Sequence, residues 1–128
     1  MGSRTEETEG SEDSSLHCRS KKRSPTIIIY TTCKDKTEAR KIAKALLDER
    51  LVACANIFPC TSLYRWEGRL CDESECAMLM KTRPAHWQKL QRRIKELHSY
   101  DLPCIERIEA KASREFEAWI QAETGHAG

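Results

Sequence analysis

The sequence is poor in glycine, proline and aromatic residues, with 5 glycines, 4 prolines and 6% Phe, Trp and Tyr among its 128 residues. We recognise no glycine-rich phosphate-binding loop in it. The chain also lacks any apolar run near the roughly 20 residues that span a bilayer. Its charges nearly balance, at +2 overall, which does not indicate a nucleic-acid-binding surface. We therefore expect neither a membrane nor a nucleic acid as a partner.

Cysteine, in contrast, is frequent, but its number and spacing do not indicate a disulfide framework. The number is odd, no CxxC pair occurs, and residues 1–24 lack the apolar middle region of an export signal. This pattern is typical of reduced thiols, so we expect a cytoplasmic protein. A free cysteine usually packs as a small hydrophobic side chain. That default applies to each of Cys18, Cys33, Cys54, Cys60, Cys71, Cys76 and Cys104.

Residues 1–24 differ in composition from the rest of the chain. Met1 and Leu16 are their only aliphatic side chains, and an acidic stretch is followed by a short basic run. Such a polar segment cannot bury enough apolar area to offset the entropy lost on ordering. We expect a disordered tail over 1–24, one domain over 25–124 and a disordered end over 125–128. The basic run fits a solvated linker, with a localisation or docking signal as the alternative.

The first two elements of the domain have clear patterns. Residues 26–32 are β-branched or aromatic, which predicts a central strand buried on both faces. Asp35 is expected to be a helix N-cap, with Glu38 three residues later completing a capping box. Apolar side chains then recur at spacings of three and four, as in an amphipathic helix. The buried stripe is predicted to hold Ala39, Ile42, Ala43, Leu46 and Leu47.

Further strands are predicted at 52–58, 75–82 and 103–108, with a bulge or bend near Pro59 because proline lacks a ladder donor. Pro84 suits the start of a second helix and Ser113 the N-cap of a third. The side chains expected to be buried are Trp87, Leu90, Ile94 and Leu97 in the second helix, and Phe116, Trp119 and Ile120 in the third.

Residues 61–70 predict a long hairpin between the second and third strands. Apolar and polar side chains alternate, with Ser62, Tyr64 and Trp66 on one face. Gly68 supplies the backbone freedom for the turn. The ribbon carries two aromatic rings and no nucleophile, which favours an interface over a reaction.

The resulting order, β-α-β-β-α-β plus a terminal helix, is typical of an α+β ferredoxin-like fold with an antiparallel sheet and helices on one face. This fold also includes acylphosphatases, which use an arginine in a glycine-containing loop after the first strand. Residues 31–35 contain neither, so we expect no enzyme. RNA-recognition modules stack bases on aromatic residues of central strands, where this chain has Met78, Leu79 and Met80.

Metal binding is the chemistry that remains. Cys33 follows the first strand and His98 ends the second helix, and these two termini can meet in a ferredoxin-like fold. Thiolate and imidazole ligands suit copper or zinc. Asp101, Glu106 or a neighbouring subunit are candidates for further ligands, since closed sites use about four. A structural role at the helix end is the alternative for His98.

Several motifs in order resemble the CutA divalent-cation-tolerance proteins. They are residues 30–33, 53–57, 62–68, 81–82, 98–103 and 119–120. The resemblance implies a homotrimer whose long strands pair across subunits, and a link to copper and other divalent cations. Lys34 stands where the family usually has proline, and Cys104 where it has an acid, while Asp101 keeps a carboxylate.

From these observations we expect a trimeric, CutA-like, non-enzymatic protein that binds a divalent metal ion, copper first. The expected metal ligands are Cys33, His98 and Asp101, and Tyr64 and Trp66 are expected in the trimer interface. The alternative is a scaffold resembling PII signalling proteins, in which clefts between subunits bind a small molecule or a protein partner.

Overall fold

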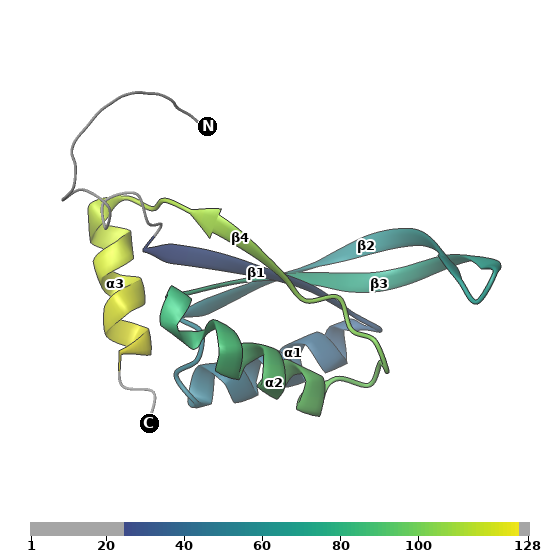
Figure 1. Ribbon diagram of the computed structural model, residues 1–128, viewed down its shortest axis with the longest axis horizontal. Helices are drawn as coiled ribbons and strands as arrows, with labels where there is room; N and C mark the ends of the chain where they lie inside the picture. The colour runs from purple at the N-terminus through teal and green to yellow at the C-terminus, as the bar shows by residue number, and fades with distance from the viewer. Residues whose placement is uncertain (1–24, 126–128) are drawn as a thin grey trace.

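The computed structural model describes residues 25–125 (Figure 1), so the predicted tail over 1–24 and the last three residues lie outside it. The elements confirm the ferredoxin-like order. They are β1 (Thr26–Cys33), α1 (Lys36–Asp48), β2 (Cys54–Trp66), β3 (Arg69–Thr82), the 3₁₀ turn η2 (Pro84–His86), α2 (Trp87–Leu97), β4 (Glu106–Ala110) and α3 (Arg114–Thr124).

The four strands form one antiparallel sheet in the order β2-β3-β1-β4. Helices α1 and α2 lie against one face of this sheet, and α3 stands at the end away from the β2-β3 hairpin (Figure 1). The core lies between the sheet and the two helices, because both present apolar stripes there. Its largest fully buried members include Ile27, Ile29, Ile42, Leu46, Met78, Met80, Leu90 and Ile94.

Strand β1 is fully buried on one face only. Ile27 and Ile29 face the helices and are inaccessible, whereas Ile28 and Tyr30 on the other face are half-buried. The prediction of a strand buried on both faces is therefore wrong for the single chain. The reason is that no helix within residues 25–125 covers the second face of the sheet (Figure 1).

Strand β2 contains no bulge, so of the bulge or bend expected near Pro59 the bulge is excluded. Pairing with β3 runs one residue for one residue from Cys54 opposite Lys81, through Pro59 opposite Cys76, to Trp66 opposite Arg69. Proline is tolerated because β2 is an edge strand, where a missing donor on the open side breaks no ladder bond. The hairpin extends beyond the core (Figure 1).

Strand β4 begins at Glu106, later than the predicted start at residue 103. It pairs with β1 from Thr26 opposite Ala110 to Tyr30 opposite Glu106. Continuing this register would place Cys104 opposite Thr32. The carbonyl of Thr32 instead bonds the imidazole of His98 at 2.7 Å, so the ladder stops.

The helix caps are confirmed and the buried stripes are confirmed in part. Asp35 and Ser113 accept the N–H groups of Glu38 and Phe116 at 2.8 and 3.3 Å, as N-caps do. Some side chains that were expected to be buried are exposed in the single chain. They are Leu47, Phe116 and Trp119. Phe116 and Trp119 stack on each other on α3, which lies outside the two-helix core.

None of the helices found within residues 25–125 combines the length and the apolar character required to cross a membrane.

Candidate metal site

The candidate site is built where β1 ends and α1 begins. Cys33 is the last residue of β1, and strand alternation turns its side chain to the same face as Ile27 and Ile29. The residue has 0% of its surface exposed and belongs to the hydrophobic core. The thiol therefore points under the sheet, toward the start of α1.

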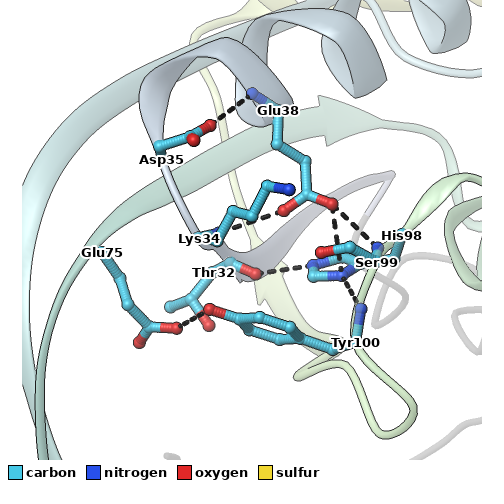
Figure 2. A network of polar contacts seen from close by, with 8 residues as sticks. All are labelled: Thr32, Lys34, Asp35, Glu38, Glu75, His98, Ser99 and Tyr100. Atoms are coloured by element: carbon cyan, nitrogen blue, oxygen red, sulfur yellow. Dashed lines mark hydrogen bonds and ion pairs between the residues drawn. The ribbon is translucent and has the colours of Figure 1, made fainter.

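Glu38 approaches from the first turn of α1 and is 8% exposed. Its Oε1 accepts the backbone N–H of Lys34 at 3.0 Å, and its Oε2 accepts that of Ser99 at 2.8 Å (Figure 2). The predicted capping box is thus formed in part: Asp35 caps Glu38, but Glu38 reaches back past Asp35 to Lys34. This carboxylate joins the start of α1 to the loop after α2.

His98 comes from the C-terminal end of α2, where its backbone N–H still bonds Ile94 at 2.9 Å. Nδ1 accepts the backbone N–H of Tyr100 at 3.1 Å, which assigns the ring proton to Nε2. Nε2 therefore donates to the carbonyl of Thr32 at 2.7 Å. The imidazole is fixed in one orientation by two backbone groups (Figure 2).

These three side chains converge. One ligand atom from each of Cys33, Glu38 and His98 lies within 4.8 Å of the others. Nδ1 of His98 stands 3.9 Å from Oε2 of Glu38. Both are electron-rich when the imidazole is neutral, so a cation between them would be stabilised.

Sequence reasoning paired Cys33 with His98, and the structure places them together. Asp101, the predicted third ligand, is exposed and outside this group, as is Glu106 on β4. Glu38 was missed as a ligand because its capping-box position already explained it. Its place three residues after an N-cap, beside the strand-end Cys33, was the available signal.

The local environment disfavours a negative charge on the sulfur. Burial, reinforced by Glu38, raises the pKa of the Cys33 thiol to about 12. For Glu38 itself, burial acts to raise the pKa, but hydrogen bonds from Ser99 and Lys34 lower it overall. The metal-free site therefore combines a thiol, a carboxylate and a neutral imidazole, and a bound metal must displace the thiol proton.

Tyr100 packs against the imidazole of the site and links it to β3. Its ring lies against His98 with the centroids 4.7 Å apart, and its hydroxyl donates to Glu75 on β3 (Figure 2). Burial and this carboxylate raise the pKa of Tyr100, which keeps the phenol protonated. The loop after α2 is thereby held against β3.

The donor set fits a metal ion chemically. Thiolate and imidazole are ligands of copper and zinc, and a carboxylate also serves zinc. A ligating histidine usually donates its second ring N–H to a carbonyl or carboxylate, and Nε2 of His98 does so to Thr32. Nδ1 would therefore be the ligand atom, and it would have to release the N–H of Tyr100 that it accepts in the metal-free site. Cys33, Glu38 and His98 would hold the ion.

The hairpin aromatic residues lie away from this site. Tyr64 and Trp66 are 40% and 45% exposed in the single chain, near the tip of the β2-β3 hairpin. Their place in a trimer interface stays a prediction.

Residues 27–123 match the family model described as CutA1 divalent ion tolerance protein. This chain belongs to that family. The match includes the end of β1, helix α1 and the end of α2, so Cys33, Glu38 and His98 all lie inside the family domain.

Proteins with similar sequences agree with this assignment. The divalent-cation tolerance protein CutA of Pyrococcus horikoshii is 43% identical over 99 residues, which span 77% of this chain and 97% of the relative. The same-named protein of Thermus thermophilus is 41% identical over 100 residues, again 77% and 97% of the two chains.

Solved structures show the same fold. The crystal structure of CutA1 from Pyrococcus horikoshii superposes with a TM-score of 0.75 at 42% identity, covering 77% of this chain and 97% of that one. The structure described as periplasmic divalent cation tolerance protein CutA from Archaeoglobus fulgidus gives 0.76 at 39% identity, covering 77% and 98%. These names refer to divalent cations and do not favour the PII-like alternative.

Proposed function

We propose that this CutA1 family protein binds a divalent metal ion, copper first, at Cys33, Glu38 and His98. The observation that carries the proposal is the convergence of a thiol, a carboxylate and an imidazole within 4.8 Å. The divalent-cation names of the family and of its relatives support it. Glu38 replaces the exposed Asp101 as the carboxylate of the site.

Copper is preferred because the affinity of divalent first-row metals for a nitrogen, oxygen and sulfur site is greatest for copper. Three protein ligands are one fewer than the four of a closed zinc site. The remaining position would be filled by solvent or by a neighbouring subunit. Burial of Cys33 and His98 limits access, so we expect slow but specific loading.

The test is titration of copper and of zinc into the wild-type protein and the Cys33→Ala/His98→Ala double variant. Removing two of three ligands should weaken zinc binding by at least about 100-fold, since losing even an outer-shell partner costs about 10–100-fold. Glu38→Gln should weaken binding by about tenfold or more, because a neutral amide replaces the anionic ligand.

Two variants serve as controls. Asp101→Asn changes an exposed carboxylate outside the group, and Cys54→Ala removes a thiol from β2. Both should keep wild-type affinity, and circular dichroism should show that every variant is folded. Unchanged affinity in the double variant would rule out the site.

We also infer that the protein works as a homotrimer. The sheet face opposite the helices carries apolar side chains that the single chain leaves partly or largely exposed, and a partner chain would bury them. They are Ile28, Tyr30, Phe58, Leu79 and Ile108. The exposed Tyr64 and Trp66 extend this apolar surface along the hairpin.

Finally, we propose a cytoplasmic, non-enzymatic role. The odd number of cysteines, seven, and the lack of a CxxC pair in the sequence support a reducing compartment. The candidate site offers ligands held by backbone groups, with a protonated thiol in place of an activated nucleophile. Cell fractionation checks the location. Turnover of any substrate that is lost in the Cys33→Ala/His98→Ala variant would contradict the non-enzymatic role.

A further inference from the structure

The last residue pair of the β1-β3 ladder consists of two cysteines. Cys33 lies directly opposite Cys76, and both are free thiols in the hydrophobic core. The other strand cysteines of residues 25–125 face different partners: Cys54 faces Lys81, Cys60 faces Glu75 and Cys71 faces Tyr64. Within that range the ladders oppose two cysteines at this position alone.

The register places the two thiols within reach of a disulfide. Directly opposed residues of an antiparallel pair have Cα atoms about 4.5 or 5.5 Å apart, depending on the type of pair. Disulfides are found at Cα separations of about 4.4–6.8 Å, so either type suffices. Opposed side chains also project to the same face of the sheet. Cys33 and Cys76 therefore satisfy the Cα distance and the side-chain direction that a disulfide needs.

The bond would form under mild strain. Cβ atoms of opposed residues are about 4.5–5.5 Å apart, against a mean of about 3.8 Å in disulfides. The end of β1 must therefore move slightly toward β3, in which Cys76 is an interior residue paired with Pro59 of β2. Cys33 is the final residue of β1, so no further pair resists this movement. A strained disulfide of this kind is readily reduced again.

We propose that Cys33 and Cys76 form a reversible cross-strand disulfide that acts as a redox control of the metal site. Cys33 is a member of the candidate ligand set, and Cys76 is not. A disulfide would remove the sulfur of Cys33 from the three ligands and leave Glu38 and His98. The regulatory part rests on the proposed metal binding, whereas the disulfide itself does not.

The oxidant is a low-molecular-weight disulfide such as oxidised glutathione. Cys76 is 9% exposed and Cys33 is 0% exposed, so the sulfur of Cys76 attacks first and releases one glutathione. The Cys33 thiol then loses its proton, and the resulting thiolate attacks the mixed disulfide on the directly opposed Cys76 and releases the second glutathione. One protein disulfide forms, one glutathione disulfide is consumed, and the two thiol hydrogens leave on the two released thiols.

The test uses the full chain in which Cys18, Cys54, Cys60, Cys71 and Cys104 are changed to Ser, together with the wild type. After incubation with oxidised glutathione and alkylation in denaturant, the five-Ser variant should lose two hydrogens in mass and yield a Cys33–Cys76 linked peptide. The same peptide should appear in the wild type, which controls for misfolding of the variant. Adding Cys76→Ser should abolish it, and reduced glutathione should reverse it.

A zinc titration then examines the regulatory step. We expect the oxidised five-Ser variant to bind zinc at least about tenfold more weakly than its reduced form, because one ligand has been removed. Finding only glutathione adducts, or Cys33 and Cys76 still open to alkylation after unfolding, would refute the disulfide. Equal zinc affinity in the oxidised and reduced forms would refute the proposed redox control of metal binding. If the disulfide forms but neither form binds zinc, the redox control and the proposed metal function both fail, and the disulfide stands.

Discussion

At the scale of the residue, Glu38 has the most connected role. It is the third residue of α1, and its two oxygens accept N–H groups from Lys34 and from Ser99, which lies 61 positions away along the chain. These bonds keep an anion in a nearly buried place, where an unpaired carboxylate would be costly. The same anion faces Cys33 and His98, which makes it a structural clamp and a candidate ligand.

The environment of Cys33 predicts an alkaline loss of stability in the metal-free protein. Its pKa is raised from 9.0 to about 12 by burial, so below about pH 9 the thiol is protonated in both states. Above that pH the unfolded chain ionises first, and the free energy of unfolding falls as the pH approaches 12.

Urea unfolding between pH 8 and pH 11 measures this slope. Cys33→Ala should be less stable at pH 8 because a buried sulfur is lost, but its stability should fall less steeply with pH. Between pH 8 and pH 11 the wild type should lose about 1–2.5 kcal/mol more of its free energy of unfolding than the variant does, since each pH unit between the two pKa values corresponds to about 1.4 kcal/mol. Parallel slopes would mean that the thiol ionises as easily in the folded protein as in the unfolded one.

At the scale of the element, the β2-β3 hairpin and α3 are stabilised in different ways. The hairpin depends on a long, unbroken ladder closed by a two-residue turn of Glu67 and Gly68. Helix α3 depends on polar anchors, since Arg83 donates to Thr124 and to the carbonyl of Gln121. Only Ile120 and Thr124 of α3 are buried, so few apolar contacts hold it in the single chain.

The turn predicts a stabilising substitution. Glu67 has a φ of 50° and Gly68 a φ of 80°, the left-handed region in which asparagine and glycine are favoured. Glu67→Asn should raise the free energy of unfolding by about 0.5–1 kcal/mol, because the strain of a long side chain in this region is relieved. Chemical denaturation of the two proteins measures the difference.

Glu67→Ala is the matched control, since it removes the same charge but keeps an unfavourable backbone position. It should give little or no gain. Equal stabilisation by alanine and asparagine would show that the charge, and not the φ of the turn, limits stability.

At the scale of the whole molecule, the main feature is a sheet covered on one face. Helices α1 and α2 cover one side (Figure 1). The other side and the hairpin expose aromatic and aliphatic side chains. Exposed apolar surface of this kind marks interaction sites. The expected trimer would cover it, and the candidate metal site lies on the opposite, helix-covered face next to the end of β1.

The hairpin aromatic residues provide the test of assembly. Tyr64→Ala/Trp66→Ala should shift the protein from trimer to smaller species in light scattering at low concentration in mild denaturant. Aromatic anchors commonly cost about 2 kcal/mol or more each when truncated in an interface, which is at least tenfold in affinity.

Leu63→Ala/Leu70→Ala is a useful comparison, because both leucines are exposed on the opposite face of the same hairpin. The leucine variant should dissociate less than the Tyr64→Ala/Trp66→Ala variant in the same light-scattering measurement. A Tyr64→Ala/Trp66→Ala variant that remained as trimeric as the wild type would contradict this role of the two rings.

The element order, the N-caps and the turn could be predicted without the structure, because they follow from periodicity and from local hydrogen bonding. The stripe of Leu90 and Ile94 and the cap of Asp35 needed no tertiary information. Motifs spread along the chain also indicated the family. The sequence also indicated that Cys33 and His98 can meet, since their elements end at the same side of a ferredoxin-like fold.

The residue that completes the candidate site and the cysteine that faces Cys33 could be identified only from the packing of distant segments. Glu38 faces His98 because α1 and the loop after α2 pack at one end of β1, a relation between distant segments that no local pattern encodes. Strand register likewise decided that Cys76 opposes Cys33, and that β4 stops where His98 takes the carbonyl of Thr32. Local rules act over a few residues, whereas register and packing are set by contacts between segments far apart along the chain.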